Sequence, residues 1–163
     1  MTWAMTFPSP PRSFVVHEAD AGTVPLPGGG RFVLLEDSDR TASLFGANRL
    51  ALPAGADGTR PHHHKLSTEF FYVLSGTMEF LLDGRLNPVG DGGLVVVPPN
   101  VTHAFGASAA GPAEFLAVLT PGIVRFDYFR QLGLIARGEA GWDSMEPLHD
   151  RFDVHFEGGA EWR

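Results

Sequence analysis

The sequence contains no cysteine. This absence excludes disulfide bonds, thiolate nucleophiles and zinc sites built from thiolates. Any bound metal must therefore take its ligands from histidine and carboxylate side chains. Such ligands suit iron, manganese, nickel or cobalt, and also zinc or copper.

Basic side chains are scarce, with 12 Lys and Arg against 19 Asp and Glu and a net charge of -7. Without a basic patch to neutralise phosphates, nucleic acid is not an expected partner. The longest apolar runs, such as residues 94–99, fall far short of the roughly 20 residues that a membrane-spanning helix needs. The N-terminus also lacks the positive start and apolar segment of a secretory signal, so we expect a soluble, cytoplasmic protein with no membrane partner.

The length of 163 residues, with 44% hydrophobic residues and 13 phenylalanines, is suited to one domain with a substantial core. The first twelve residues hold Pro8, Pro10 and Pro11, which disfavour both a helix and a central strand. We therefore expect a flexible tail over residues 1–12 and a single domain over residues 13–163.

Short β-rich runs separated by turn residues fill the chain as far as Leu119. Gly, Pro, Asp and Asn dominate the turns, and Asp83-Gly84 is a strong hairpin signal. This pattern favours an antiparallel all-β sandwich or barrel. The expected strands cover residues 13–17, 31–36, 42–45, 49–52, 69–74, 77–82, 86–89, 94–97, a segment near residue 103 and residues 113–119.

After Pro121 the apolar spacing becomes helical, through Ile123, Phe126, Phe129, Leu132 and Ile135. It predicts a covering helix over about residues 122–135. A short last helix is expected between residues 144 and 152, followed by a terminal strand over residues 152–156. We expect Arg125, Tyr128 and Arg130 on the exposed face of the covering helix, with gating of the barrel mouth as the alternative.

The most informative segment is residues 62–76, with the sequence H-H-H-K-L-S-T-E-F-F-Y-V-L-S-G. Alternate side chains of an extended strand share a face, so His62 and His64 project together while His63 points the opposite way. Glu69 then opens the next β-rich run and can bring a carboxylate beside the two imidazoles. His17, His149 and His155 have no partners at ligand spacing and are given no role.

A second informative segment is residues 92–105, with the sequence G-G-L-V-V-V-P-P-N-V-T-H-A-F. A buried strand runs into a rigid proline turn, and His103 follows the turn. His62, His64, Glu69 and His103 together make a set of three histidines and one carboxylate, which suits a five- or six-coordinate metal with open positions.

These two segments resemble the two sequence motifs of the cupins. His62-x-His64-x4-Glu69-x6-Gly76 matches the core of the first motif, G-x5-H-x-H-x4-E-x6-G, in every spacing. The second motif, G-x5-P-x-G-x2-H-x3-N, is followed by Gly92, Pro98 and His103. Departures occur at Ala56, Asn100 and Ala107, where the motifs have Gly, Gly and Asn. None of them removes a ligand, and the resemblance covers about residues 45–120.

The resemblance implies a cupin double-stranded β-helix, a jelly-roll-like barrel with extra N-terminal strands and a C-terminal helical cap. It implies one divalent transition metal held by the four ligands, and homodimerisation through the N-terminal strands. The segment after the barrel is similar to that of small cupins related to quercetin 2,3-dioxygenases. That subgroup implies an oxidoreductase that uses dioxygen on an aromatic or enolic small molecule, with Glu69 both binding the metal and taking a proton from the substrate.

Other functions remain open, because the cupin fold also hosts metal-dependent isomerases, cyclases and lyases, and proteins that only bind a small ligand. Glu69 could also orient a histidine without touching the metal. Phe71, Phe80 and Phe105 are candidate walls of a substrate pocket if they face the barrel interior, and ordinary core residues otherwise.

Overall fold

The computed structural model describes residues 12–157 and 161–163. The expected tail therefore lies outside the described residues, apart from Arg12, which belongs to neither a helix nor a strand.

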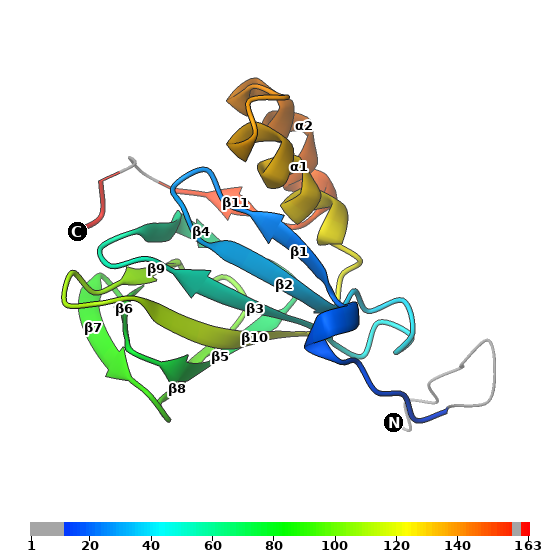
Figure 1. The fold of residues 1–163 in the computed structure, drawn as a ribbon, viewed down its shortest axis with the longest axis horizontal. Helices are drawn as coiled ribbons and strands as arrows, with labels where there is room; N and C mark the ends of the chain where they lie inside the picture. The colour runs from blue at the N-terminus through cyan, green and yellow to red at the C-terminus, as the bar shows by residue number, and fades with distance from the viewer. Residues whose placement is uncertain (1–11, 158–160) are drawn as a thin grey trace.

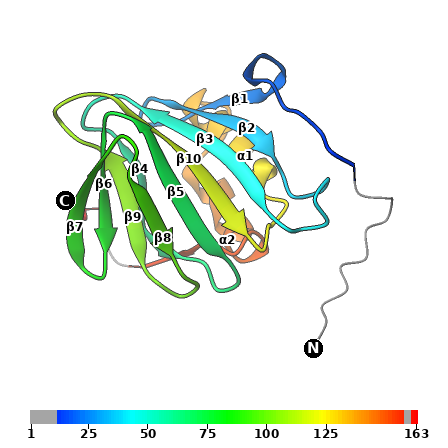
Figure 2. The same ribbon diagram turned by 90° about the horizontal axis from the view of Figure 1, so that it is seen from below.

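Two antiparallel β-sheets form the body of the molecule and curve around a common core (Figures 1 and 2). The six-stranded sheet has the order β1 (Gly22–Pro25), β2 (Arg31–Glu36), β3 (Gly46–Leu52), β10 (Ala113–Thr120), β5 (Thr68–Ser75) and β8 (Leu94–Val97). The five-stranded sheet has the order β11 (His155–Phe156), β4 (Asp57–His63), β9 (His103–Ala107), β6 (Thr77–Leu82) and β7 (Arg85–Gly90). The all-β barrel expected from the sequence is confirmed.

Alternation along the strands places phenylalanine rings between the sheets. In β10 every second residue is buried, and Phe115 of this strand packs at 5.0 Å from both Phe71 of β5 and Phe105 of β9. Phe80 of β6 is fully buried beside Phe71, with ring centroids 5.2 Å apart. Each fully buried phenylalanine contributes roughly 1.5–3 kcal/mol of hydrophobic stabilisation, so this group anchors the two sheets to each other.

The backbone conformation of two turns accounts for two glycine positions of the sequence motifs. Gly76, between β5 and β6, has a φ of 72°, and a Cβ there would lie 2.2 Å from the carbonyl oxygen of Pro112. Only glycine fits this position. Asn100 has a φ of 65°, which asparagine tolerates, so this substitution for glycine keeps the turn before His103.

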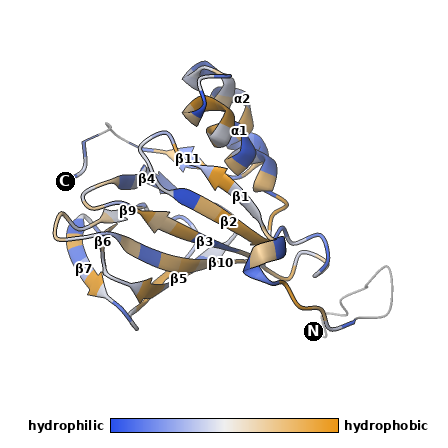
Figure 3. Cartoon of the chain, viewed as in Figure 1, coloured by the Kyte–Doolittle hydropathy of each residue, from blue (hydrophilic) through white to orange (hydrophobic). Residues whose placement is uncertain are grey.

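The segment after β10 forms α1 (Phe126–Ala136), a 3-10 turn η2 (Trp142–Met145) and α2 (Glu146–Arg151), which lie together beside β1 and β11 (Figure 1). Phe129 of α1 stacks on Phe32 of β2 with centroids 4.2 Å apart. Figure 3 shows hydrophobic and hydrophilic stretches on the same helices, as expected for a cap with one face against the barrel. No helix in the described part of the chain is long and apolar enough to cross a membrane.

Several expected boundaries differ from the structure. Residues 13–17 are irregular and lead into a short 3-10 turn, η1 (Glu18–Asp20), instead of forming a strand. Residues 42–45 are also not a strand, because Ala42 and Ser43 have φ values of 50° and 62°. The covering helix begins at Phe126, later than expected, because the Asp37 carboxylate accepts hydrogen bonds from the N–H groups of Arg125 and Phe126.

Candidate metal centre

Four buried side chains from three strands meet at one point of the barrel. His62 lies near the end of β4, His64 just beyond it, Glu69 near the start of β5 and His103 at the start of β9. In the β4–β9 ladder His62 pairs directly with His103, which explains how residues distant in sequence become neighbours. One ligand atom from each side chain lies within 4.8 Å of all the others. The structure thus brings together the four residues selected from the sequence.

The three imidazoles are oriented by backbone carbonyls on their outer side. The Nδ1 atom lies 3.0 Å from the Arg60 oxygen for His62, 2.7 Å from the Asp153 oxygen for His64 and 3.0 Å from the Val101 oxygen for His103. A carbonyl can only accept a hydrogen bond, so each Nδ1 carries the proton. In the neutral ring Nε2 then has a free lone pair, as a metal ligand requires.

These lone pairs face another acceptor. The Nε2 atoms of His64 and His103 lie 3.2 Å and 3.3 Å from Oε2 of Glu69. Burial holds the pKa of His62 well below its usual value, so protonation of this imidazole is disfavoured. Lone pairs that converge in a buried site need a cation between them. The donor set therefore fits a divalent transition metal.

Glu69 also contacts a residue that no motif indicates. Its Oε1 atom accepts a hydrogen bond from Arg125 Nη2 at 2.9 Å. Burial alone would raise the pKa of Glu69, but the Arg125 charge opposes it, and the pKa is held well below its usual range. The carboxylate is therefore ionised and ready to ligate.

The prediction that three residues of the covering helix are exposed is wrong for Arg125 and Tyr128. Arg125 and Tyr128 are 6% and 7% exposed and turn toward the barrel, whereas the Arg130 side chain is 57% exposed. Burial raises the pKa of Tyr128 to about 12, so its hydroxyl keeps its proton. The helical spacing could have predicted this burial, because Arg125 and Tyr128 lie on the same helix face as the apolar residues Phe129 and Leu132.

Asp153 is a second residue that sequence reasoning missed. It adopts a φ of 55°, and besides receiving the His64 Nδ1–H on its carbonyl it accepts carboxylate hydrogen bonds from the N–H groups of Lys65 and Leu66 at 2.9–3.0 Å. His155 Nε2 lies 2.9 Å from the same carboxylate. Asp153 thus fixes both the ring and the backbone of the His64 segment.

His63 lies on the opposite side of β4, as strand alternation predicts. Its Nδ1 atom is 2.7 Å from a Glu157 carboxylate oxygen, and its ring stacks on His155 with centroids 5.2 Å apart. The middle histidine of the triplet therefore belongs to the contact between β4 and β11.

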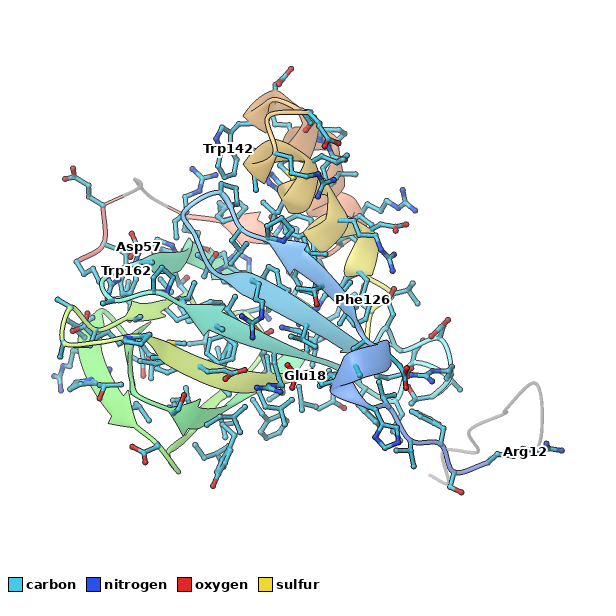
Figure 4. The ribbon with its side chains drawn as sticks, viewed as in Figure 1. Arg12, Glu18, Asp57, Phe126, Trp142 and Trp162 are labelled. Carbon is cyan, nitrogen blue, oxygen red and sulfur yellow. The ribbon has the colours of Figure 1, made fainter. Side chains whose placement is uncertain are left out.

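A cavity of about 780 Å³ opens beside the cluster. Phe71 and Phe105 line it, while Phe80 packs behind them in the core. The cap adds Tyr128 and His149 to the lining. Figure 4 shows two further lining residues, Trp142 near the helices and Trp162 beside Asp57. The arrangement is an aromatic pocket that also holds Glu69 and its partner Arg125 in its wall.

A barrel of two antiparallel sheets with a buried cluster of three histidines and one carboxylate is the arrangement of a small β-barrel with a candidate metal site. Residues 48–119 match the family model described as the cupin domain. Residues 48–119 thus carry a cupin domain, and the fold around them is shared with cupin structures. This match does not identify a subgroup, so the predicted relation to quercetin dioxygenases is not confirmed.

Several solved structures share this fold. The polyketide cyclase RemF from Streptomyces resistomycificus is 28% identical over 68% of this chain and 80% of its own, with a TM-score of 0.56. A variant of Streptomyces Pac13 with uridine is 19% identical over 71% and 88% of the two chains, with a TM-score of 0.56. A predicted oxalate decarboxylase from Thermotoga maritima is 22% identical over 66% and 98%, with a TM-score of 0.58. No curated protein gives a significant match to the sequence.

Proposed function

We propose that the chain is a metal-dependent enzyme that converts a flat, enolisable small molecule without using dioxygen, by cyclisation, isomerisation or elimination. The observation that carries this proposal is the convergence of three Nε2 lone pairs and a carboxylate oxygen beside an aromatic cavity. The 28% identity to a polyketide cyclase favours this reaction class.

His62, His64, Glu69 and His103 would hold the metal, with iron, manganese, nickel and cobalt as the leading candidates and zinc or copper as others. A divalent ion in this position stabilises negative charge that develops on a carbonyl or enol oxygen of the substrate. Phe71 and Phe105 offer ring faces and edges that would hold a flat substrate beside it.

The proton-accepting role that the resemblance gives to Glu69 is restricted by Arg125. A carboxylate whose pKa is held well below its usual range is a weak base near neutral pH. We therefore assign Glu69 first to metal ligation. It would act as a base only if substrate binding drew Arg125 away from Oε1.

A dioxygenase reaction is the second candidate, because two of the histidines with Glu69 form the two-histidine, one-carboxylate combination found in non-haem iron oxygenases. The decisive experiment incubates protein reconstituted with each metal with a panel of polyhydroxylated aromatic ketones, with and without oxygen. New products that form without oxygen, and whose mass equals that of the substrate or is lower by one water molecule, support the first proposal. Turnover that occurs only with oxygen, and adds oxygen atoms, supports the dioxygenase, and no conversion with any metal supports a binding protein.

We also propose a homodimer formed through the N-terminal strands. β1 is the edge of its sheet, and Phe14 and Val15, which precede η1, are 43% and 77% exposed. An exposed strand edge is suited to pairing with a second copy, and exposed apolar side chains in the N-terminal segment can add to such a contact. Light scattering coupled to size exclusion should give twice the 17.6 kDa chain mass, and Val15→Asp should shift it toward the monomer.

A further inference from the structure

Arg125 is held in the cavity wall by the start of α1. Its backbone N–H donates to the Asp37 carboxylate at 2.7 Å, and the same oxygen accepts the Phe126 N–H at 2.8 Å. The guanidinium also lies over the Phe129 ring, 5.1 Å from its centroid. Anchors at the backbone and at the side chain together fix the guanidinium in a buried position that lines the cavity.

Among residues 12–157 and 161–163, the acceptors for this guanidinium contact a single nitrogen, Nη2. Nη2 donates to Glu69 Oε1 at 2.9 Å and approaches Asn48 Oδ1 at 3.4 Å. Nε and Nη1 have no hydrogen-bond acceptor among the described residues. They are also absent from the fully buried polar atoms that lack a partner, so they remain accessible. Asn48, on β3, is itself 2% exposed and lines the same cavity. Arg125 therefore retains donors that a ligand in the cavity can reach.

The charges around Arg125 favour a negative ligand. Glu69 is the carboxylate that Arg125 contacts, and it would be shared with a divalent ion. One negative charge then faces the guanidinium and the ion together. The other acidic residues of the cavity wall lie at exposed positions, and the Asp57 side chain is paired with Arg163. A buried excess of positive charge is costly unless an anion compensates it.

We propose that Arg125, supported by Asn48, binds a negatively charged oxygen of the substrate, so that the enzyme selects a carboxylate, enolate or phenolate over its neutral analogue. This inference rests on the proposed function, which it deepens by naming the substrate class. Arg125 would act on the side of Glu69 away from the histidines. The substrate would thus be held at two points, the histidine cluster and the guanidinium.

The test uses protein loaded with cobalt(II), whose absorption spectrum reports whether the histidine cluster is intact. Titration calorimetry compares 2-naphthoate, a flat aromatic carboxylate, with its neutral methyl ester. The wild type should bind the acid more tightly than the ester. Arg125→Met should weaken acid binding by about 10- to 100-fold and leave ester binding nearly unchanged, because a charged hydrogen bond is lost only with the acid.

Arg130→Met is the matched control, since it removes the same charge from an exposed position of the same helix. Arg125→Lys should retain part of the preference, because it keeps the charge but not the planar donors. Asn48→Asp should also weaken acid binding, by placing a negative charge beside the subsite. If Arg125→Met does not fold or loses cobalt, the ratio of acid to ester affinity in Asn48→Asp decides whether the inference holds.

Equal affinity of the wild type for acid and ester, or an acid-to-ester ratio that stays unchanged in Arg125→Met or Asn48→Asp with an unaltered cobalt spectrum, would overturn the inference. These binding ratios do not depend on turnover. A protein that selects the acid through Arg125 but converts no substrate would refute the proposed function and leave this subsite standing.

Discussion

The candidate site has two halves that differ in origin. One half, His62, His64, Glu69 and His103, comes from barrel strands and their turns. The other half, with Arg125, Tyr128, His149 and Asp153, comes from the segment after β10. The strand half supplies lone pairs and one negative charge, while the cap half supplies hydrogen-bond donors, a positive charge and support for the His64 segment. In the proposed function, metal binding would therefore belong to the barrel, and selection of the ligand would belong mainly to the cap.

The largest expected effect is a loss of metal affinity on substitution of a ligand in the strand half. His64→Ala removes one of four converging ligands and should lower metal affinity by more than about 100-fold, beyond the loss typical of supporting residues. His63→Ala is the matched control, because this ring faces Glu157 and His155 instead. Chelator competition followed by elemental analysis measures both. Equal losses in the two variants would contradict the assigned ligands.

A smaller but clear effect is expected across the two halves. Asp153→Ala removes the carboxylate that holds the N–H groups of Lys65 and Leu66, and so loosens the position of His64. Metal affinity should fall by about 10- to 100-fold. Asp150→Ala, at a side chain that is 99% exposed, should change it little. If metal affinity stayed at the wild-type level in Asp153→Ala, the Asp153 carboxylate would have no part in holding His64.

The strand half was predictable from the sequence because strand geometry converts spacing directly into direction. His62 and His64 share a face through the period of two, and a proline turn with Asn100 in the left-handed region delivers His103. The cap half was not predictable, because Arg125 and Asp153 reach Glu69 and His64 through chain separations of 56 and 89 residues. No local pattern records such packing. The dioxygenase subgroup stays a prediction for a related reason, since the donor set is shared by many reactions.

The strand half should also make the stability of the protein depend on pH, in two separate windows. In the metal-free protein the folded pKa of His62 lies below its usual 6.5, so the unfolded chain takes up a proton that the folded state rejects. The free energy of unfolding should therefore be intact above about pH 6.5 and fall by about 1.4 kcal/mol per pH unit below it, until the folded pKa is reached. Urea unfolding at several pH values measures this slope.

Glu69 adds a second, lower pH window to this profile. Its folded pKa is depressed below the usual 4.5, so its contribution is present above that value and is lost as pH falls further. His62→Gln should flatten the upper window and leave the lower one. A profile with the same slope near pH 6 in wild type and His62→Gln would contradict the assignment to His62.

The smallest effect concerns the aromatic wall, where the strand half also contributes to ligand selection. Phe105 lines the cavity, so Phe105→Leu should weaken binding of an aromatic ligand such as methyl 2-naphthoate by about 2- to 10-fold, the loss of one aromatic contact. Phe80→Leu alters the same kind of residue one layer deeper, where it packs against Phe71. It should lower thermal stability and leave this affinity close to wild type. Equal weakening by both variants would mean that the pocket wall responds as one unit with the core, and that the barrel shapes the ligand as much as the cap does.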